Sequence, residues 1–181
     1  RAGDATQEGV LGELGQRGER VREGVACGGR SRGATGRAVA RELGAFRASV
    51  VGDYEDMGKP VSGGAPQGLT VQTWPQPLRR VVGNLVDNAL RYAGSAEIDA
   101  GRDAAGKPWI SVSDRGPGIP EDQLQAVLAP FHRLESSRNR DTGGTGLGLA
   151  IAVQLAQSLG GSLQLRNRDG GGLQAVLQLP G

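Results

Sequence analysis

The chain has 181 residues, enough for one ordinary domain with an added segment and too few for two full hydrophobic cores. Its formal net charge is only +2, so the composition argues against nucleic acid as a partner. The single cysteine, Cys27, excludes a disulfide framework, and no apolar run is long enough to form a membrane segment. We expect a cytoplasmic location, which is compatible with the cytoplasmic part of a membrane sensor.

Residues 1–36 differ from the rest because they alternate glycine, arginine and glutamate with few large apolar side chains. Such a composition buries little surface, so disorder or a frayed helix is the favoured prediction. Four apolar residues at heptad-like spacing keep a helical alternative open: Val10, Leu14, Val21 and Val25.

The second region, residues 37–181, has the periodicity of a folded domain. The elements expected are an amphipathic helix from Val39 to Gly58, strands at Val61 and 69–73, a helix over 75–93, strands at 96–101 and 109–114, a loop over 115–145, a helix over 146–159, and strands at 162–166 and 173–179. A loop of that length is usually a functional lid or disordered. The sum is an α+β two-layer sandwich, with helices on one face of a mixed, mostly antiparallel sheet and a long lid.

The helix over 75–93 carries the first candidate site. Asn84 and Asn88 are four residues apart, so they lie on one helix face, with Arg91 one turn further on. Two carboxamides there would suit a hydrated Mg²⁺ ion and its phosphates, and an arginine would suit phosphate oxygens. Taken alone, this pattern is more often a solvated face.

The second candidate begins at the end of a predicted strand, in Asp114-Arg-Gly-Pro-Gly-Ile-Pro120. Gly116 and Gly118 would let a ligand approach the backbone, and Ile119 would form an apolar wall. A buried carboxylate that accepts from the exocyclic amine of adenine would select adenine over guanine. An ordinary turn is an equally good interpretation of this stretch alone.

Two further motifs lie in or beside the long loop. Phe131 is an isolated aromatic residue, and Arg133 and Arg138 are candidates to reach a phosphate. His132, the chain's single histidine, is expected to be a solvent-exposed side chain and not a metal ligand. The stretch Gly143-Gly-Thr-Gly-Leu-Gly-Leu-Ala-Ile151 runs into a predicted helix, whose N–H groups and dipole favour anionic oxygens.

The four motifs, in this order, resemble the catalytic ATP-binding domain of two-component sensor histidine kinases, within the superfamily shared with gyrase, mismatch-repair proteins and a heat-shock chaperone. The resemblance covers roughly residues 39–180. In family terms, 84–89 resembles the N box, 114–118 the G1 box, 130–134 the F box and 144–148 the G2 box.

The resemblance implies Mg-ATP as ligand, with Asn88 as the Mg²⁺-binding asparagine assisted by Asn84. It implies catalytic roles for Asn84, Asn88, Arg91, Arg133 and Arg138. Nucleotide contacts are implied for Asn84, Asn88, Arg91, Tyr92, Asp114, Gly116, Gly118, Ile119, Phe131, Gly144, Thr145, Gly146, Leu147 and Gly148.

The reaction that the resemblance implies is transfer of the γ-phosphoryl group of ATP to a histidine of a dimerisation domain, with a response regulator as a later partner. Related ATPases have a water-activating glutamate at the position of Asn84, which cannot act as a base, so little hydrolysis is expected. The alternatives are a catalytically silent nucleotide-binding module and an anti-sigma-type serine kinase of the same superfamily.

Two departures from the family pattern stand out. The phosphoacceptor segment, a histidine followed by an acidic residue and an Arg-Thr-Pro-like stretch, is not found, and residues 1–36 stand where the dimerisation hairpin would end. We expect a fragment or a product with a degenerate hairpin, and hence a monomer. In addition, Trp74-Pro-Gln-Pro77 replaces the usual acidic residue before the N box, which leaves the capping of that helix open.

Overall fold

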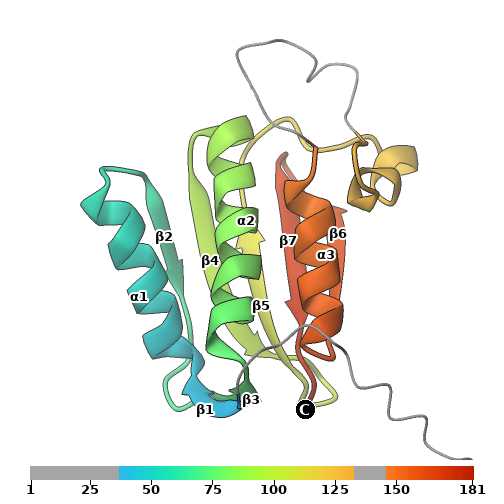
Figure 1. Cartoon of the computed structure of the whole chain (residues 1–181). Helices are drawn as coiled ribbons and strands as arrows, with labels where there is room; N and C mark the ends of the chain where they lie inside the picture. Colours follow the sequence, from blue (N-terminus) through green and yellow to red (C-terminus); the bar gives the residue numbers. More distant parts are fainter. Residues whose placement is uncertain (1–36, 133–145) are drawn as a thin grey trace, which may run out of the picture. The chain divides into compact units, whose positions relative to one another are not determined.

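A computed structural model of the chain describes residues 37–132 and 146–181. Its main sheet has five strands in the order β2-β4-β5-β7-β6 (Figure 1). The strands are β2 (Val61–Gly64), β4 (Ala96–Arg102), β5 (Pro108–Ser113), β6 (Ser162–Asn167) and β7 (Leu173–Gln178). β2 pairs parallel with β4 and the other pairs are antiparallel. The sheet is therefore mixed and mostly antiparallel, as predicted.

Three helices lie on one face of this sheet (Figure 1): α1 (Leu43–Asp56), α2 (Pro75–Ala93) and α3 (Gly148–Ser158). Strand residues alternate between the two faces, so every second side chain points into this helix layer. Those side chains are apolar and buried: Ile98, Ala100, Ile110, Val112, Leu163, Leu165, Ala175 and Leu177. The core thus lies between the sheet and the helices, which confirms the predicted two-layer sandwich.

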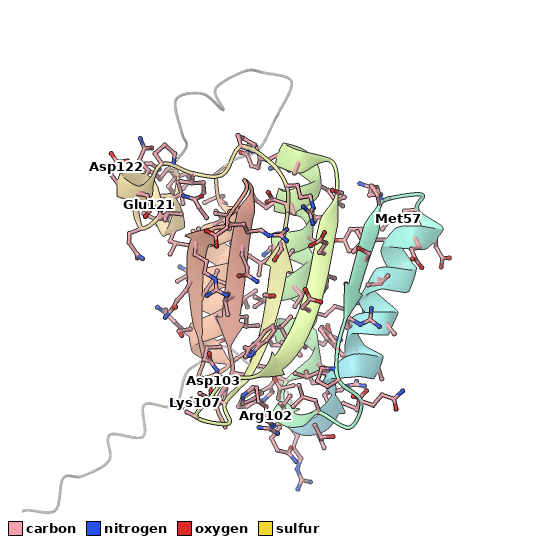
Figure 2. The ribbon with its side chains drawn as sticks, turned by 180° about the vertical axis from the view of Figure 1, so that it is seen from behind. Met57, Arg102, Asp103, Lys107, Glu121 and Asp122 are labelled. Atoms are coloured by element: carbon pink, nitrogen blue, oxygen red, sulfur yellow. The ribbon has the colours of Figure 1, made fainter. Side chains whose placement is uncertain are left out.

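The opposite face of the sheet is covered by no helix in the part of the chain that the structure describes (Figure 2). Polar residues from four neighbouring strands form a row across it, in the order Glu97, Ser113, Gln174 and Arg166. The Nε of Arg166 donates to Oε1 of Gln174 at 2.6 Å. This face is therefore polar along the row, and one hydrogen bond joins the last two residues of the row.

The start of α1 differs from the prediction. Val39 does not begin the helix but belongs to strand β1 (Val39–Glu42), which pairs antiparallel with β3 (Thr70–Thr73) in a separate two-stranded sheet. The Glu42 side chain caps α1 by accepting from the backbone N–H groups of Gly44 and Ala45. These bonds lower the pKa of the Glu42 carboxyl. The helical spacing of Val39 was coincidental, because the cap places the boundary at Leu43.

The start of α2 resolves the question of its cap. Pro75 and Pro77 are the first and third residues of this helix. Neither has an N–H group, so two of the donors that the start of a helix leaves unpaired do not exist. At the other end, Gly94 stops the helix with a left-handed φ of 75°.

The predicted long loop contains two short 3-10 helices, η1 (Glu121–Gln123) and η2 (Ala126–Leu128). Leu124 and Val127 from this segment are buried in the core. Residues 133–145 and the predicted disorder of 1–36 lie outside the described residues, so the domain boundary at 36 stays a prediction. Among the helices described, none is both long and apolar enough to cross a bilayer.

Candidate functional site

Strand register places Asp114 at one end of the main sheet. Glu97 pairs with Ser113, whereas Arg102 pairs with Pro108 at the opposite end of the same two strands. Asn167 pairs with Leu173 at the Ser113 end of the neighbouring strands. The end that holds Asp114, which follows Ser113, is here called the site end, and the end that holds Arg102 and Pro108 is called the far end. In Figure 2, Glu121 and Asp122 mark the site end, and Asp103 and Lys107 mark the far end.

Asp114 is the buried charged residue of the site end, with 7% of its surface exposed. Its Oδ1 accepts from the backbone N–H groups of Gly116 at 2.8 Å and Leu173 at 3.1 Å. These bonds fix the orientation of the carboxylate. Among the described residues, every hydrogen-bond donor to this carboxylate bonds to Oδ1. The second oxygen, Oδ2, accepts none of these bonds, and the predicted contact with adenine would use this oxygen.

The loop after Asp114 lies against the last turn of α2. A Cβ placed on Gly116 would come within 3.2 Å of the Ala93 Cβ and 3.3 Å of the Tyr92 carbonyl oxygen. This close approach brings the G1-box-like loop next to the helix end that carries Arg91 and Tyr92. Both of these side chains are exposed.

The two asparagines of α2 are half-buried, and the Nδ2 of Asn84 is buried without a hydrogen-bond partner among the described residues. An unpaired buried amide costs free energy, so a ligand or bound water at this position is expected. Asp87, between them in sequence, accepts from the Tyr54 hydroxyl of α1 at 2.8 Å. Burial and this bond raise the pKa of Tyr54.

Gly118 and Ile119 are held by Asn167, at the end of β6. Asn167 accepts from the Ile119 N–H at 2.9 Å and donates to the Ile119 carbonyl at 2.7 Å. Gly118 has a φ of 72°, and a Cβ there would lie 2.7 Å from the Asn167 Oδ1. Glycine is therefore required at this position for two reasons, conformation and space.

A pair of charges supports the strand end. The Arg168 guanidinium donates to the Asp114 carbonyl oxygen at 3.0 Å and pairs with Glu97 at 3.2 Å. Arg115, which is more exposed, lies 3.4 Å from the same carboxylate. Sequence analysis missed Asn167, Arg168 and Glu97. The available signal was the polar pair directly before the Asp-Gly-Gly-Gly turn, where strand alternation ends.

Helix α3 begins at the site end, because its last residues lie at the far end beside Pro108 and Pro180. Leu147 is its N-cap residue and provides no side-chain cap bond, which leaves the N–H groups of the first turn for an anion. Gly146, with a φ of 71°, and Gly148 flank it. Four predicted site residues lie outside the described residues: Arg133, Arg138, Gly144 and Thr145.

The aromatic residue of the F-box-like stretch is conformationally unusual. Phe131 has a φ of 62° and is 75% exposed, and it is the one non-glycine residue with positive φ in 37–132 and 146–181. His132 is half-buried, and its Nδ1 is buried without a described partner. The expectation of a solvent-exposed His132 is therefore corrected. Ile119 packs at the margin of the core, and its role as a pocket wall stays a prediction.

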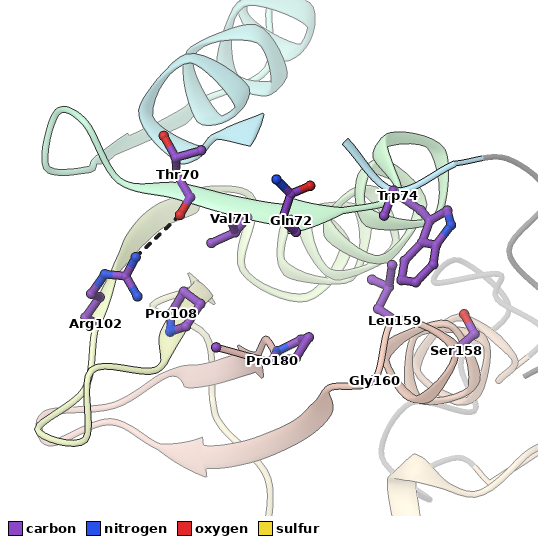
Figure 3. Close-up of a pocket in the computed structure, with 12 residues that line it drawn as sticks. Thr70, Val71, Gln72, Trp74, Arg102, Pro108, Ser158, Leu159, Gly160 and Pro180 are labelled. Atoms are coloured by element: carbon purple, nitrogen blue, oxygen red, sulfur yellow. Dashed lines mark hydrogen bonds between the residues drawn. The ribbon is translucent and has the colours of Figure 1, made fainter. Parts of the chain in front are cut away.

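A hollow of about 530 Å³ lies at the far end (Figure 3). Its lining includes Val71, Trp74, Arg102, Pro108, Leu159 and Pro180, and none of the predicted site residues. The Arg102 guanidinium is bonded to the carbonyl oxygens of Thr70 and Gly106, at 3.4 and 2.7 Å. The hollow is therefore separate from the group of residues around Asp114.

Known proteins resemble this chain in sequence. The sensor histidine kinase YkoH of Bacillus subtilis is 37% identical over 113 residues, which cover 62% of this chain and 25% of YkoH. CpxA of Escherichia coli is 36% identical over 130 residues, which cover 71% of this chain and 28% of CpxA. The chain thus spans about a quarter of the length of these relatives.

Solved structures show the same fold. The ATP binding domain of PrrB from Mycobacterium tuberculosis matches with a TM-score of 0.64 and 28% identity, over 81% of this chain and 98% of that one. The histidine kinase domain of the E. coli osmosensor EnvZ matches with a TM-score of 0.61 and 31% identity, over 82% and 91%. Residues 74–181 match the model of one family. The chain therefore belongs to the histidine kinase-, DNA gyrase B- and HSP90-like ATPase family.

Proposed function

We propose that this domain binds ATP with Mg²⁺ and transfers the γ-phosphoryl group to a histidine of a phosphoacceptor domain, in a longer chain or in a separate protein. The observation that carries the proposal is the Asp114 carboxylate, buried at a strand end and fixed through Oδ1 by two backbone N–H groups. Burial of a carboxylate is costly unless a donor satisfies it. Two backbone N–H groups serve Oδ1, and the exocyclic amine of adenine would be the donor to Oδ2.

Discrimination between bases would follow from the fixed orientation of Asp114. Adenine presents an amine to Oδ2, whereas guanine presents a carbonyl oxygen, so two acceptors would face each other. Gly116 and Gly118 would leave room for the base, with Ile119 and Tyr92 beside it. The phosphates would extend toward Arg91 and the first turn of α3, where Gly146 and Gly148 expose the backbone.

The residues present fit a magnesium site of the kind that uses few protein ligands. In the described ranges no group of three or more His, Cys, Asp or Glu side chains gathers for a metal. Magnesium keeps several waters and needs one or two protein oxygens beside phosphate oxygens. Asn88 and Asn84 would supply these oxygens. The unpaired Nδ2 of Asn84 is a donor, so it would face a phosphate oxygen or a metal-bound water and not the ion itself. The ion would neutralise charge on the triphosphate.

The acceptor in the proposed transfer is an imidazole nitrogen, which forms the new P–N bond as the bond to the bridging oxygen of ADP breaks. The carboxamide of Asn84 has no useful basicity, so water is not activated at this position. The protein would act by positioning the nucleotide and the acceptor. A response regulator would take the phosphoryl group afterwards.

The first test is calorimetric titration of the full chain with a non-hydrolysable ATP analogue and Mg²⁺. We expect micromolar affinity, about −8 kcal/mol, and loss of binding in Asp114→Asn. Asparagine keeps an Oδ1 acceptor for the two backbone N–H groups, so the fold should persist while a donor replaces Oδ2. The matched control is Asp103→Asn, because the exposed Asp103 also accepts from two backbone N–H groups through Oδ1.

The second test supplies a histidine-bearing hairpin domain and radiolabelled ATP. We expect label on the hairpin that is lost in acid, since phosphohistidine is acid-labile. Acid-stable label would indicate the anti-sigma-type serine kinase, and nucleotide binding without any label would indicate a silent module. Absence of nucleotide binding by the unmodified chain would refute the proposal.

A further inference from the structure

We infer that Asn167 and Arg168, at the end of β6, are positioning residues that set the selectivity of the site for adenine over guanine. The inference rests on the proposed function and extends it to residues outside the four sequence motifs. Neither residue belongs to the motif that contains Asp114, but both bond to the backbone of that motif.

Asn167 fixes the distal side of the loop. Its carboxamide makes two hydrogen bonds with one residue, accepting from the Ile119 N–H at 2.9 Å and donating to the Ile119 carbonyl at 2.7 Å. The same Nδ2 lies 3.5 Å from the Glu121 carboxylate. Because both backbone groups of Ile119 are held by one side chain, the loop cannot shift here without losing both bonds.

Arg168 fixes the proximal side of the loop. It donates to the Asp114 carbonyl oxygen at 3.0 Å, and its other terminal nitrogen pairs with Glu97 on β4 at 3.2 Å. It is only 25% exposed at the side chain, so the contact is partly shielded from water. The peptide that carries Asp114 is thereby tied to β4 through a guanidinium.

Selectivity depends on this rigidity. A carboxylate that faces the guanine carbonyl penalises guanine only if it cannot turn away or admit a water molecule. Two adjacent residues of one strand end clamp both sides of the loop that presents Asp114. A looser loop would weaken the bond to adenine and relax the repulsion against guanine at the same time.

The test measures dissociation constants of the full chain for non-hydrolysable ATP and GTP analogues, with Mg²⁺ present. In Asn167→Ala we expect affinity for the ATP analogue to fall about tenfold. We expect affinity for the GTP analogue to change less than about twofold, so the preference for the ATP analogue over the GTP analogue decreases. The matched control is Arg166→Ala, because this neighbouring side chain bonds to Gln174 on the open sheet face and does not touch the loop.

An unchanged ratio of the two dissociation constants would overturn the inference. This covers the case of equal losses for both analogues, which would show a general structural role. If Asn167→Ala does not fold, Asn167→Asp replaces it, because the aspartate keeps the acceptor for Ile119 but turns a carboxylate toward the Ile119 carbonyl and Glu121. The same narrowing of the ratio is then expected, and an unchanged ratio again contradicts the inference. Failure of the unmodified chain to bind the ATP analogue would instead refute the proposed function.

Discussion

Asp114 and Asp103 lie at opposite ends of strand pair β4–β5 and bond in the same way. Each accepts two backbone N–H groups through Oδ1: Asp103 from Ala105 and Lys107, both at 2.9 Å, and Asp114 from Gly116 and Leu173. Asp103 is exposed, so water satisfies its second oxygen and the residue only closes a turn. Asp114 is 7% exposed, and no hydrogen bond from the described residues reaches its second oxygen, to which the proposed function assigns the adenine amine. Burial, and not the bonding pattern, separates Asp103 from the residue that we propose as the adenine contact.

The two ends of the sheet also differ in where the hollow lies and in which of the described polar groups lack partners. The far end has the hollow of about 530 Å³, but its arginine already bonds to carbonyl oxygens of the chain. The site end has the fixed carboxylate of Asp114, and the unpaired amide of Asn84 lies on α2, whose last turn reaches this end. The hollow and the proposed nucleotide site therefore lie at opposite ends of the sheet, and the proposal rests on fixed polar groups and not on volume.

The largest expected effect comes from truncating a carboxamide at one end of α2. Asn88→Ala should lower phosphorylation of a supplied histidine domain on the order of a hundredfold or more, the usual loss when a preorganised polar group is removed from a phosphate site. The matched control is Gln76→Ala, which removes an exposed carboxamide from the far end of the same helix. Equal losses in the two variants would contradict the assignment of function to one end.

The next effect compares two hairpin glycines with positive φ. Gly172, with a φ of 103°, lies against Asp114, and a Cβ there would overlap the Asp114 carbonyl oxygen. Gly106 has a φ of 78° in the far-end turn, with nothing near its Cβ position. Both alanine variants bear the conformational cost, about 1 kcal/mol. Gly172→Ala should lose about 2 kcal/mol more in urea unfolding, because the overlap displaces backbone.

Nucleotide binding gives this comparison a second measurement. The displaced backbone in Gly172→Ala is that of Asp114, so affinity for the ATP analogue should fall together with stability. Gly106→Ala should bind as the unmodified chain does. If Gly172→Ala were destabilised but bound ATP normally, the hairpin turn would support the fold without shaping the pocket.

Most of the fold was predictable because its signals are local. The helix over 75–93 follows from apolar spacing and from Gly94, and the alternation in 109–114 identifies β5. Val39 was assigned wrongly, because its spacing fits the helix but Glu42 forms a cap that ends the preceding strand. A side-chain cap competes with periodicity over a few residues, and spacing alone does not show which prevails.

The candidate site was predictable only as a set of motifs. The approach of Gly116, two residues after Asp114, to the last turn of α2 depends on how the elements pack. In the same way, β2 joins the sheet parallel to β4 across a long sequence separation. Asn167 and Arg168 were missed because their role lies in bonds to the backbone of a loop about 50 residues earlier. Such contacts leave no periodic trace in a single sequence.

The smallest effect tests how α1 supports the site end. The Tyr54 hydroxyl donates to Asp87 at 2.8 Å, next to Asn88 in sequence. Tyr54→Phe should lower the free energy of unfolding by about 1 kcal/mol, the usual net contribution of one hydrogen bond. Urea unfolding measures the change. The ATP-to-GTP affinity ratio should stay as it is, because Tyr54 does not contact the loop from Asp114 to Ile119.

The difference in unfolding free energy between the unmodified chain and Tyr54→Phe should depend on pH. Partial burial and the Asp87 bond raise the pKa of Tyr54 above its ordinary value of 10.0. Above that pH the unfolded chain releases the proton while the folded chain keeps it, so the stabilisation present below pH 10.0 is lost as pH rises. The stability difference between the unmodified chain and Tyr54→Phe should therefore be constant near neutrality and shrink above this value. A stability difference that grew with pH would mean that Tyr54 ionises more readily in the folded state. The bond to Asp87 would then not keep the Tyr54 hydroxyl protonated.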